Sequence, residues 1–325
     1  MTRRRDFVAL ILGIVAIPAK VCAQKSKLSR IGLLRTTSVD LRDPGAEGLR
    51  LGLRELGYAE GQNLQIEYRW AEGAPDRIPL LAADLVRLEV AVIVTGGEQA
   101  ILAAKQATRT IPIVMGASND AVQAGLVASL ARPGGNITGM TILSPDLSRK
   151  RLQLLAEVLP LASRVAVLSN PSYPGTALEM RETLSAAKEL GLTLHTLEVR
   201  SEAELEAAIE AARERADALL LLGDPFFTAH RRLIAGLATK HRLPGVYYWK
   251  EFTDAGGLMS YGPNLRDMYR RAAWHVDRIL KGAKPADLPV EQPTRYEFTI
   301  NLATAKAFNL AIPQSALVRA DSVIR

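Results

Sequence analysis

The sequence predicts an α/β protein built from two lobes, each of them a doubly wound parallel sheet. From Leu28 onward, short apolar runs alternate with amphipathic segments at the spacing of βαβ units. A second, similar series begins at Val165. The chain has 325 residues, longer than a single hydrophobic core usually serves, and this length favours two lobes over one.

The first series contains five expected strands. The first strand covers 31–34. A helix then begins after Asp43, carries leucines at positions 49, 53 and 56 on one face, and ends at Gly57 in the manner of a left-handed cap. The other four strands are expected at 64–68, 90–95, 111–115 and 137–140.

The second series follows a break near 141–145. Its strands are expected at 165–168, 193–199, 218–222 and 245–248. The C-terminal part departs from a simple tandem, with a strand at 258–261 and a helix that Asn264 caps and that runs to Leu280. The stretch 282–293 holds three prolines and is predicted to be an extended connector.

The N-terminal segment 1–23 has the features of a cleaved signal peptide. Three arginines at 3–5 precede an apolar run of 7–17, which is too short for a permanent membrane anchor. Val21 and Ala23 supply the small pair before a cut, whereas Lys20 argues against lipidation at Cys22. The order Arg-Arg-Asp-Phe at 4–7 leaves Sec and Tat export both open. We expect a periplasmic protein.

Charge and cysteine content exclude several classes of function. The net charge is +7, but the predicted leader carries four basic residues and one acidic residue, so the remainder has +4, dispersed along the chain. We therefore expect no nucleic-acid partner. Cys22 is the one cysteine, and its removal with the leader would exclude thiol catalysis and zinc–thiolate sites.

Sequence motifs for catalysis are absent. The chain has no Gly-x-Ser-x-Gly elbow, no phosphate-binding loop and no Gly-x-Gly-x-x-Gly dinucleotide fingerprint. Its four histidines are far apart, without the i, i+4 spacing of a metal site. We expect no cofactor, no metal and no enzymatic activity. Carboxylate pairs that meet only in the fold leave no sequence signature, so a periplasmic enzyme on this scaffold stays open as the alternative.

Polar and aromatic residues follow the predicted strands, where doubly wound sheets bind their ligands. Such residues also serve as helix caps and turns, so only their clustering at several strand ends favours a site. Asp120 is expected to pair with a cationic group of the ligand, the alternative being a cap for the segment that runs to Leu130. The candidate ligand-binding residues are Thr36, Thr37, Gly97, Glu98, Asn119, Asp120, Asn170, Tyr173, Asp224, Tyr248 and Tyr261.

The chain contains several long motifs: GLRELGY at 52–58, GLVASLARPGGNITG at 125–139, GGLMSYG at 256–262 and PADLPVEQP at 285–293. They resemble the ABC-transporter substrate-binding family, which includes binders of aromatic amino acids. The resemblance covers essentially the whole chain after the leader. It matches Asp120, Asn170 and Asp224 to the family's Gly-Asp-Pro-Val, Asn-Pro and Asp-Pro positions. The chain departs from the family at two places: Glu98-Gln99 replaces Thr-Pro, and Ala121 replaces proline. These departures leave the identity of the ligand open.

The resemblance implies a type I periplasmic binding fold, in which the chain crosses three times between the lobes. We expect the crossings near Thr141, Thr253 and Gly282. Lobe 1 then comprises 28–141 plus 254–282, and lobe 2 comprises 142–253 plus 283–325.

The function that the resemblance implies is capture of a small polar or zwitterionic ligand, such as an amino acid or a related compound. Hinge bending would close the lobes on the ligand, which is then delivered to ABC permease subunits at the inner membrane. We expect the protein to act as a monomer.

Overall fold

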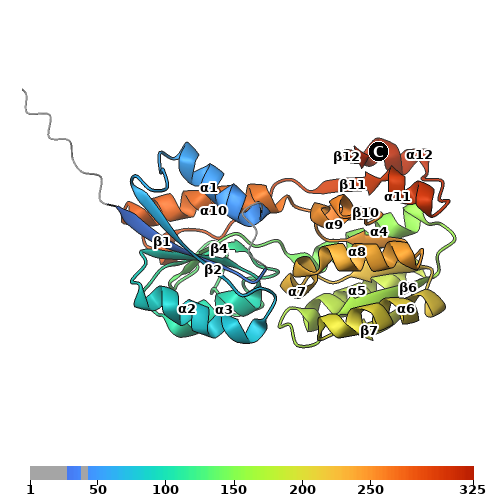
Figure 1. The fold of residues 1–325 in the computed structure, drawn as a ribbon, viewed down its shortest axis with the longest axis horizontal. Helices are drawn as coiled ribbons and strands as arrows, with labels where there is room; N and C mark the ends of the chain where they lie inside the picture. Colours follow the sequence, from blue (N-terminus) through green and yellow to red (C-terminus); the bar gives the residue numbers. More distant parts are fainter. Residues whose placement is uncertain (1–27, 38–42) are drawn as a thin grey trace, which may run out of the picture.

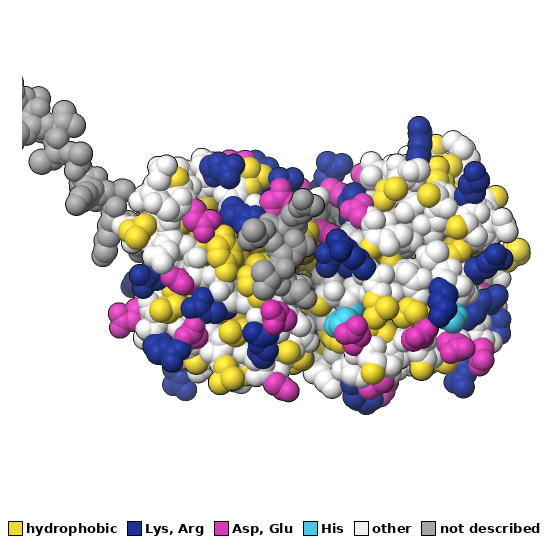
Figure 2. Space-filling model, viewed as in Figure 1, with side chains coloured by type: hydrophobic (Ala, Val, Ile, Leu, Met, Phe, Trp, Pro, Cys, Tyr) yellow, Lys and Arg dark blue, Asp and Glu magenta, His cyan; other side chains and the backbone are white. Residues whose placement is uncertain are grey.

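The computed structural model describes residues 28–37 and 43–325, so the predicted leader 1–23 lies outside the described part. Two lobes stand side by side along the long axis of the molecule (Figure 1). Basic and acidic side chains are intermixed over the face shown in Figure 2, in line with their dispersal in the sequence. Within the described ranges, no helix has the length and apolarity to cross a membrane.

Lobe 1 contains a five-stranded, all-parallel sheet in the order β2-β1-β3-β4-β5. Its strands are β1 (Ser29–Arg35), β2 (Leu64–Trp70), β3 (Val92–Gly96), β4 (Ile113–Ala117) and β5 (Ile137–Gly139). One core joins this sheet to α1 (Pro44–Glu55) and α10 (Leu265–Leu280). A second core, on the opposite face, joins it to α2 (Ile78–Arg87) and α3 (Glu98–Ala107), with η1 (Pro75–Arg77) ahead of α2. The five predicted strands are confirmed, each within a few residues.

Helix α10 returns to lobe 1 because two glycines of α1 let the helices approach closely. A Cβ on Gly48 would overlap the carbonyl oxygen of Arg266, and one on Gly52 would overlap that of Arg270. The start of α1 is fixed by Asp43, whose Oδ1 accepts a hydrogen bond from the Ala46 amide at 2.8 Å. Asn264 caps α10 in the same way, as predicted, through the Asp267 amide at 3.2 Å.

Lobe 2 contains a seven-stranded sheet in the order β12-β11-β10-β9-β8-β6-β7, in which only the β10–β11 pair is antiparallel. The strands are β6 (Arg164–Ser169), β7 (Thr193–Glu198), β8 (Ala218–Leu221), β9 (Gly245–Tyr247), β10 (Met259–Gly262), β11 (Glu297–Asn301) and β12 (Ser322–Ile324). The parallel part of this sheet was expected, and the C-terminal strands extend it.

Helices cover both faces of the second sheet. One core includes α4 (Ser144–Val158), α5 (Thr176–Leu190), α11 (Leu302–Ala307) and α12 (Gln314–Arg319). The core on the other face includes α6 (Leu205–Arg215), α7 (Pro225–Ala229), α8 (Arg231–Lys240) and α9 (Lys250–Asp254). Two short 3₁₀ turns complete the chain, η2 (Glu202–Glu204) and η3 (Pro285–Asp287).

The chain crosses between the lobes three times, but two crossings lie about ten residues beyond their predicted places. The first follows Thr141, whose amide donates to the Glu291 carbonyl. The second follows β10 rather than Thr253, because β10 pairs with β9 and so belongs to lobe 2. The third follows Glu291 rather than Gly282, because Glu291 still bridges to Met140 of lobe 1. The segments 254–262 and 283–291 are thus assigned to the opposite lobes from those expected.

Candidate functional site

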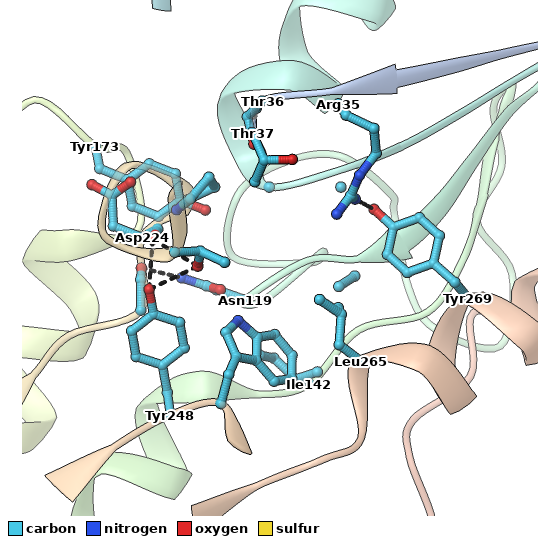
Figure 3. A pocket seen from close by; sticks show the side chains of 17 residues that line it. Arg35, Thr36, Thr37, Asn119, Ile142, Tyr173, Asp224, Tyr248, Leu265 and Tyr269 are labelled. Carbon is cyan, nitrogen blue, oxygen red and sulfur yellow. Dashed lines mark hydrogen bonds between the residues drawn. The ribbon is translucent and has the colours of Figure 1, made fainter. Parts of the chain in front are cut away.

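A cavity lies between the lobes (Figure 3), and residues that follow the carboxyl ends of strands in both sheets line it. This is the position at which doubly wound sheets bind their ligands. Lobe 1 and its connections line it with Arg35, Thr36, Thr37, Gly96, Gly97, Ala117, Asn119, Ile142, Leu265 and Tyr269. Lobe 2 lines it with Tyr173, Gly223, Asp224, Pro225, Thr228, Tyr248 and Trp249.

Most of the residues proposed from the sequence meet in this cavity. They are Thr36, Thr37, Gly97, Asn119, Tyr173, Asp224 and Tyr248. Each follows a strand directly or within a few residues, and the parallel strands of each sheet bring their carboxyl ends to one edge. Glu98, Asp120, Asn170 and Tyr261 do not line the cavity.

Asp224 provides the buried carboxylate of the cavity, with 4% of its surface exposed. Its Oδ1 accepts from the Phe226 amide at 2.7 Å, and its Oδ2 accepts from Nδ2 of Asn170 at 2.7 Å. Burial raises the pKa of Asp224 to about 6, and the carboxylates of Glu98 and Glu179 add to the rise, against the two hydrogen bonds. Asn170 therefore supports Asp224 from outside the cavity.

Asp120 is placed differently from the expectation. Its Oδ1 accepts from the amides of Val122 at 3.1 Å and Gln123 at 3.0 Å, so it caps the turn that follows β4. It lines a neighbouring groove between the lobes and not the cavity. This geometry gives Asp120 the capping role that was its alternative.

Glu98 and Tyr261 also lie outside the lining. Glu98 is 1% exposed, and its carboxylate accepts hydrogen bonds from the Asn119 amide and the Tyr173 hydroxyl. Tyr261 stacks on Tyr296 with ring centres 6.0 Å apart, and its carbonyl accepts from Nε of Arg151 at 3.0 Å. The ring of Tyr261 therefore packs against Tyr296 and does not line the cavity.

A buried cluster of Arg35, Asp43 and Tyr269 at the end of β1 was not predicted from the sequence. Arg35 is 6% exposed, and its Nη2 lies 2.8 Å from Oδ2 of Asp43. Nη1 donates to the hydroxyl of Tyr269, whose ring centre is 4.7 Å from the guanidinium carbon. Burial opposes the charge of Asp43, but the Arg35 guanidinium outweighs it and holds the pKa of Asp43 below its usual value. The signal in the sequence that could have revealed this cluster is an arginine at the end of an apolar strand.

Apolar and aromatic side chains form the side of the cavity nearest the crossings. Ile142, Trp249 and Leu265 were not among the predicted residues, and they are 3%, 7% and 7% exposed. Tyr248 lies on the same side as Ile142 and Leu265 in Figure 3, across the cavity from Thr36 and Thr37. Its hydroxyl donates to the carbonyl of Asp224 at 2.6 Å and lies 2.9 Å from Oγ1 of Thr228. The ring is thereby fixed in position.

The two lobes are in contact across the cleft. Nδ2 of Asn119 donates to the carbonyl of Gly223 at 3.2 Å, and the hydroxyl of Tyr173 donates to Glu98. Asn119 and Glu98 belong to lobe 1, whereas Gly223 and Tyr173 belong to lobe 2. The structure is therefore a closed arrangement of the lobes.

Residues 30–324 match the family model described as ABC transporter substrate binding protein. This chain belongs to that family. The match spans both lobes and all three crossings, so the resemblance drawn from the sequence motifs is confirmed, and with it the two-lobed fold of type I periplasmic binding proteins.

Individual relatives share about a quarter of their residues with this chain. A tyrosine-binding protein of Clostridioides difficile is 26% identical over 285 residues, which are 87% of this chain and 82% of that protein. A conserved domain protein of Vibrio cholerae is 28% identical with a TM-score of 0.86, covering 91% of this chain and 100% of that one. An ABC domain from Streptococcus pneumoniae in complex with L-Trp is 26% identical with a TM-score of 0.85, covering 91% and 99%.

Proposed function

We propose that this family member is an exported binding protein that captures a free amino acid in the cleft and delivers it to the permease of an ABC importer. The family and the ligands named for two relatives, tyrosine and L-Trp, support this proposal. The single observation that carries it is the charge arrangement of the cavity. A buried carboxylate lies on lobe 2 and a buried guanidinium on lobe 1.

Asp224 is the proposed partner of the ligand's ammonium group. Among the described residues, no Lys, Arg or His side chain forms an ion pair with it. A carboxylate that is 4% exposed and lacks a cation is poorly stabilised in its charged form, and a bound ammonium would supply the missing charge. The nearby carboxylate of Glu98 increases the negative potential at this end.

The ligand's carboxylate is proposed to face Arg35, Thr36 and Thr37. Asp43 compensates the charge of Arg35 in part, but Nε of Arg35 has no hydrogen-bond partner among the described residues. The Thr36 hydroxyl lies at the same end of β1 and can donate to an anion, whereas the Thr37 hydroxyl donates to Oδ2 of Asp43 at 3.3 Å and would have to turn to do so. A zwitterion would thus contact one lobe with each of its charged groups, which favours the closed form when it is bound.

The side chain of the ligand is proposed to be aromatic. Tyr248, Trp249, Ile142 and Leu265 offer apolar and aromatic surface on the side nearest the crossings. Ring-to-ring contacts add about 0.5–1.5 kcal/mol beyond simple burial. This lining is compatible with the tyrosine and L-Trp named for the two relatives.

Calorimetry tests the proposed site directly. We expect L-tyrosine or L-tryptophan to bind, tryptamine and indole-3-propionate to bind far more weakly, and Asp224→Asn to weaken binding by about 2–5 kcal/mol. Asp254→Asn is the matched control, because Asp254 pairs with Lys250 at 2.6 Å on the surface of the same lobe. Unchanged affinity in Asp224→Asn would refute the amine contact, and no binding of any amino acid would refute the proposed ligand class.

Export is tested by sequencing the N-terminus of the mature protein from the periplasmic fraction. A start directly after Ala23 is expected. An intact Met1, or a lipid-modified start at Cys22, would contradict this part of the proposal. Loss of amino-acid uptake on deletion of the gene would support delivery to an importer.

A further inference from the structure

The interlobe contact between Glu98 and Tyr173 is built more elaborately than a chance surface contact. Glu98 is the first residue of α3 in lobe 1, and Tyr173 lies in the loop after β6 in lobe 2. Both are buried, with 1% and 3% of their surfaces exposed. The tyrosine hydroxyl donates to Oε2 of Glu98 and accepts from the Glu98 amide at 3.1 Å. One hydroxyl thus makes two hydrogen bonds to a single residue of the opposite lobe.

The second oxygen of the same carboxylate is fixed within lobe 1. Oε1 of Glu98 accepts from the amide of Asn119, and the Asp120 amide lies 3.4 Å from it. The loop after β4 therefore holds the carboxylate so that its other oxygen faces lobe 2. Asn119, positioned by this contact, in turn donates to the carbonyl of Gly223 in lobe 2.

We infer that Glu98 and Tyr173 form a latch that stabilises the closed arrangement of the lobes, and that the latch sets ligand affinity without Glu98 touching the ligand. Glu98 does not line the cavity, so apart from the effect of its charge on Asp224 it acts on ligand affinity through closure. This inference rests on the proposed function, because it assumes that the lobes close when an amino acid binds. Its central claim concerns the free protein and can be measured without any ligand.

The ionisation of the two groups suits such a latch. Burial raises the pKa of the Tyr173 hydroxyl well above its ordinary value, and the Glu98 carboxylate raises it further, so the hydroxyl keeps the proton that it donates. Burial also raises the pKa of Glu98, against the hydrogen bonds from Tyr173, Asn119 and Asp120 that favour its charged form. The Asp224 carboxylate also raises the pKa of Tyr173.

The test compares the free protein with Tyr173→Phe, which removes the hydroxyl and keeps the ring. Spin labels placed at Leu80→Cys on α2 and Leu233→Cys on α8, in a Cys22→Ser background, report the distance between the lobes. These leucines are 74% and 38% exposed, one on each lobe. We expect the ratio of closed to open protein to fall about ten- to hundredfold, the effect of one hydrogen bond to a buried charged acceptor.

Tyr58→Phe is the matched control. The Tyr58 hydroxyl donates to Oδ1 of Asp277 at 3.0 Å, a tyrosine–carboxylate bond that stays within lobe 1. It should leave the distance distribution unchanged. Glu98→Ala provides a second variant, and adding Tyr173→Phe to it should have little further effect, because the two residues act through one contact. Thermal unfolding checks that each variant is folded.

The outcomes separate this inference from the proposed function. Equal distance distributions in the wild type and Tyr173→Phe would overturn the latch, whether or not an amino acid binds. Fully additive effects of Glu98→Ala and Tyr173→Phe would also overturn it. Failure of L-tyrosine and L-tryptophan to bind, with the closed population still lowered in Tyr173→Phe, would refute the ligand and leave the latch supported.

Discussion

Gly97 lies directly against Pro225 across the cleft, so that a Cβ on Gly97 would stand 2.6 Å from Cγ of the proline. Gly97 precedes α3 in lobe 1, and Pro225 begins α7 in lobe 2. The closed arrangement therefore depends on the absence of a side chain at position 97. The glycine is also required by its backbone, whose φ is 82°.

Gly97→Ala is expected to weaken ligand binding more than it lowers stability. The added methyl would keep the lobes apart, and the backbone of Gly97, at φ 82° and ψ 133°, would cost a residue with a side chain about 1–3 kcal/mol in the folded state. Gly61→Ala is the control, because Gly61 has the same φ of 82° and open space around its Cβ position. Calorimetry and urea unfolding separate the two effects. Equal losses of affinity in the two variants would contradict a role in closure.

The pH dependence of binding should follow Asp224. Its pKa of about 6 lies above the ordinary 3.8, so lowering the pH through 6 protonates the carboxylate and removes the proposed partner of the ammonium group. Free amino acids keep both charges between pH 5 and 7.5. At pH 5, one unit below this pKa, only about a tenth of the Asp224 carboxylates are ionised. Ligand affinity at pH 5 should therefore be about tenfold weaker than at pH 7.5.

Asp224→Asn serves as the control for this pH profile. The variant has no carboxylate to titrate at this position, so its weaker affinity should vary little between pH 5 and 7.5. Calorimetry of the wild type and the variant at pH 5 and at pH 7.5, with whichever of L-tyrosine and L-tryptophan binds more tightly, gives the two affinity ratios to be compared. A tenfold loss of affinity in both proteins would assign the titration to another group, such as Glu98.

The sequence predicted the parts of this fold that are encoded locally. Alternating apolar runs and amphipathic segments place the strands, and residues after strand ends, such as Thr37 and Asp224, reach the cavity because parallel strands align their carboxyl ends. Lobe membership of β10 could not be read in this way, since it depends on pairing with β9. The path of 283–291 depends likewise on contacts with β5, including the hydrogen bond from Thr138 Oγ1 to the Leu288 carbonyl at 2.7 Å.

Individual side chains of the site were harder to predict than its location. Arg35 ends an apolar strand, and nothing nearby in the sequence shows that Tyr269, 234 residues later, will meet it. Asp120 has the same local pattern as a ligand-binding aspartate, because an aspartate after a strand can cap a turn or face a cleft. The hydrogen bonds to Val122 and Gln123 distinguish the two roles.

Breaking the Arg35–Asp43 pair should destabilise lobe 1 strongly. Asp43→Asn can still accept from the Ala46 amide, but it leaves the guanidinium of Arg35 buried without its carboxylate. Removing one partner of a buried pair typically costs about 3–5 kcal/mol. Urea unfolding measures the loss. Asp254→Asn, on an exposed pair, should cost less than about 1 kcal/mol, and a similar small effect for Asp43→Asn would contradict the importance of burial.

A second buried pair, Arg151–Glu179, supports the lobe 2 side of the cavity. The Nη1 atom of Arg151 lies 3.1 Å from Oε1 of Glu179, and the two side chains are 0% and 1% exposed. Oε2 of Glu179 accepts from the amide of Gly223 at 3.0 Å, directly before Asp224. The guanidinium carbon of Arg151 also stands 5.9 Å from the ring centre of Tyr248. This pair therefore fixes two of the elements that line the cavity.

Arg151→Met should lower the free energy of unfolding by about 3–5 kcal/mol, because it leaves the Glu179 carboxylate buried without a cation. Adding Glu179→Gln should restore part of that loss, since glutamine carries no charge and its carbonyl oxygen can still accept from Gly223. Urea unfolding of the two single variants and the double variant gives the coupling free energy between Arg151 and Glu179. A double variant less stable than Arg151→Met would show that the hydrogen bonds of Glu179, rather than its charge balance, dominate. In either case, a folded double variant should bind the amino acid only slightly more weakly than the wild type, because the Gly223 amide, and with it Asp224, stays in place.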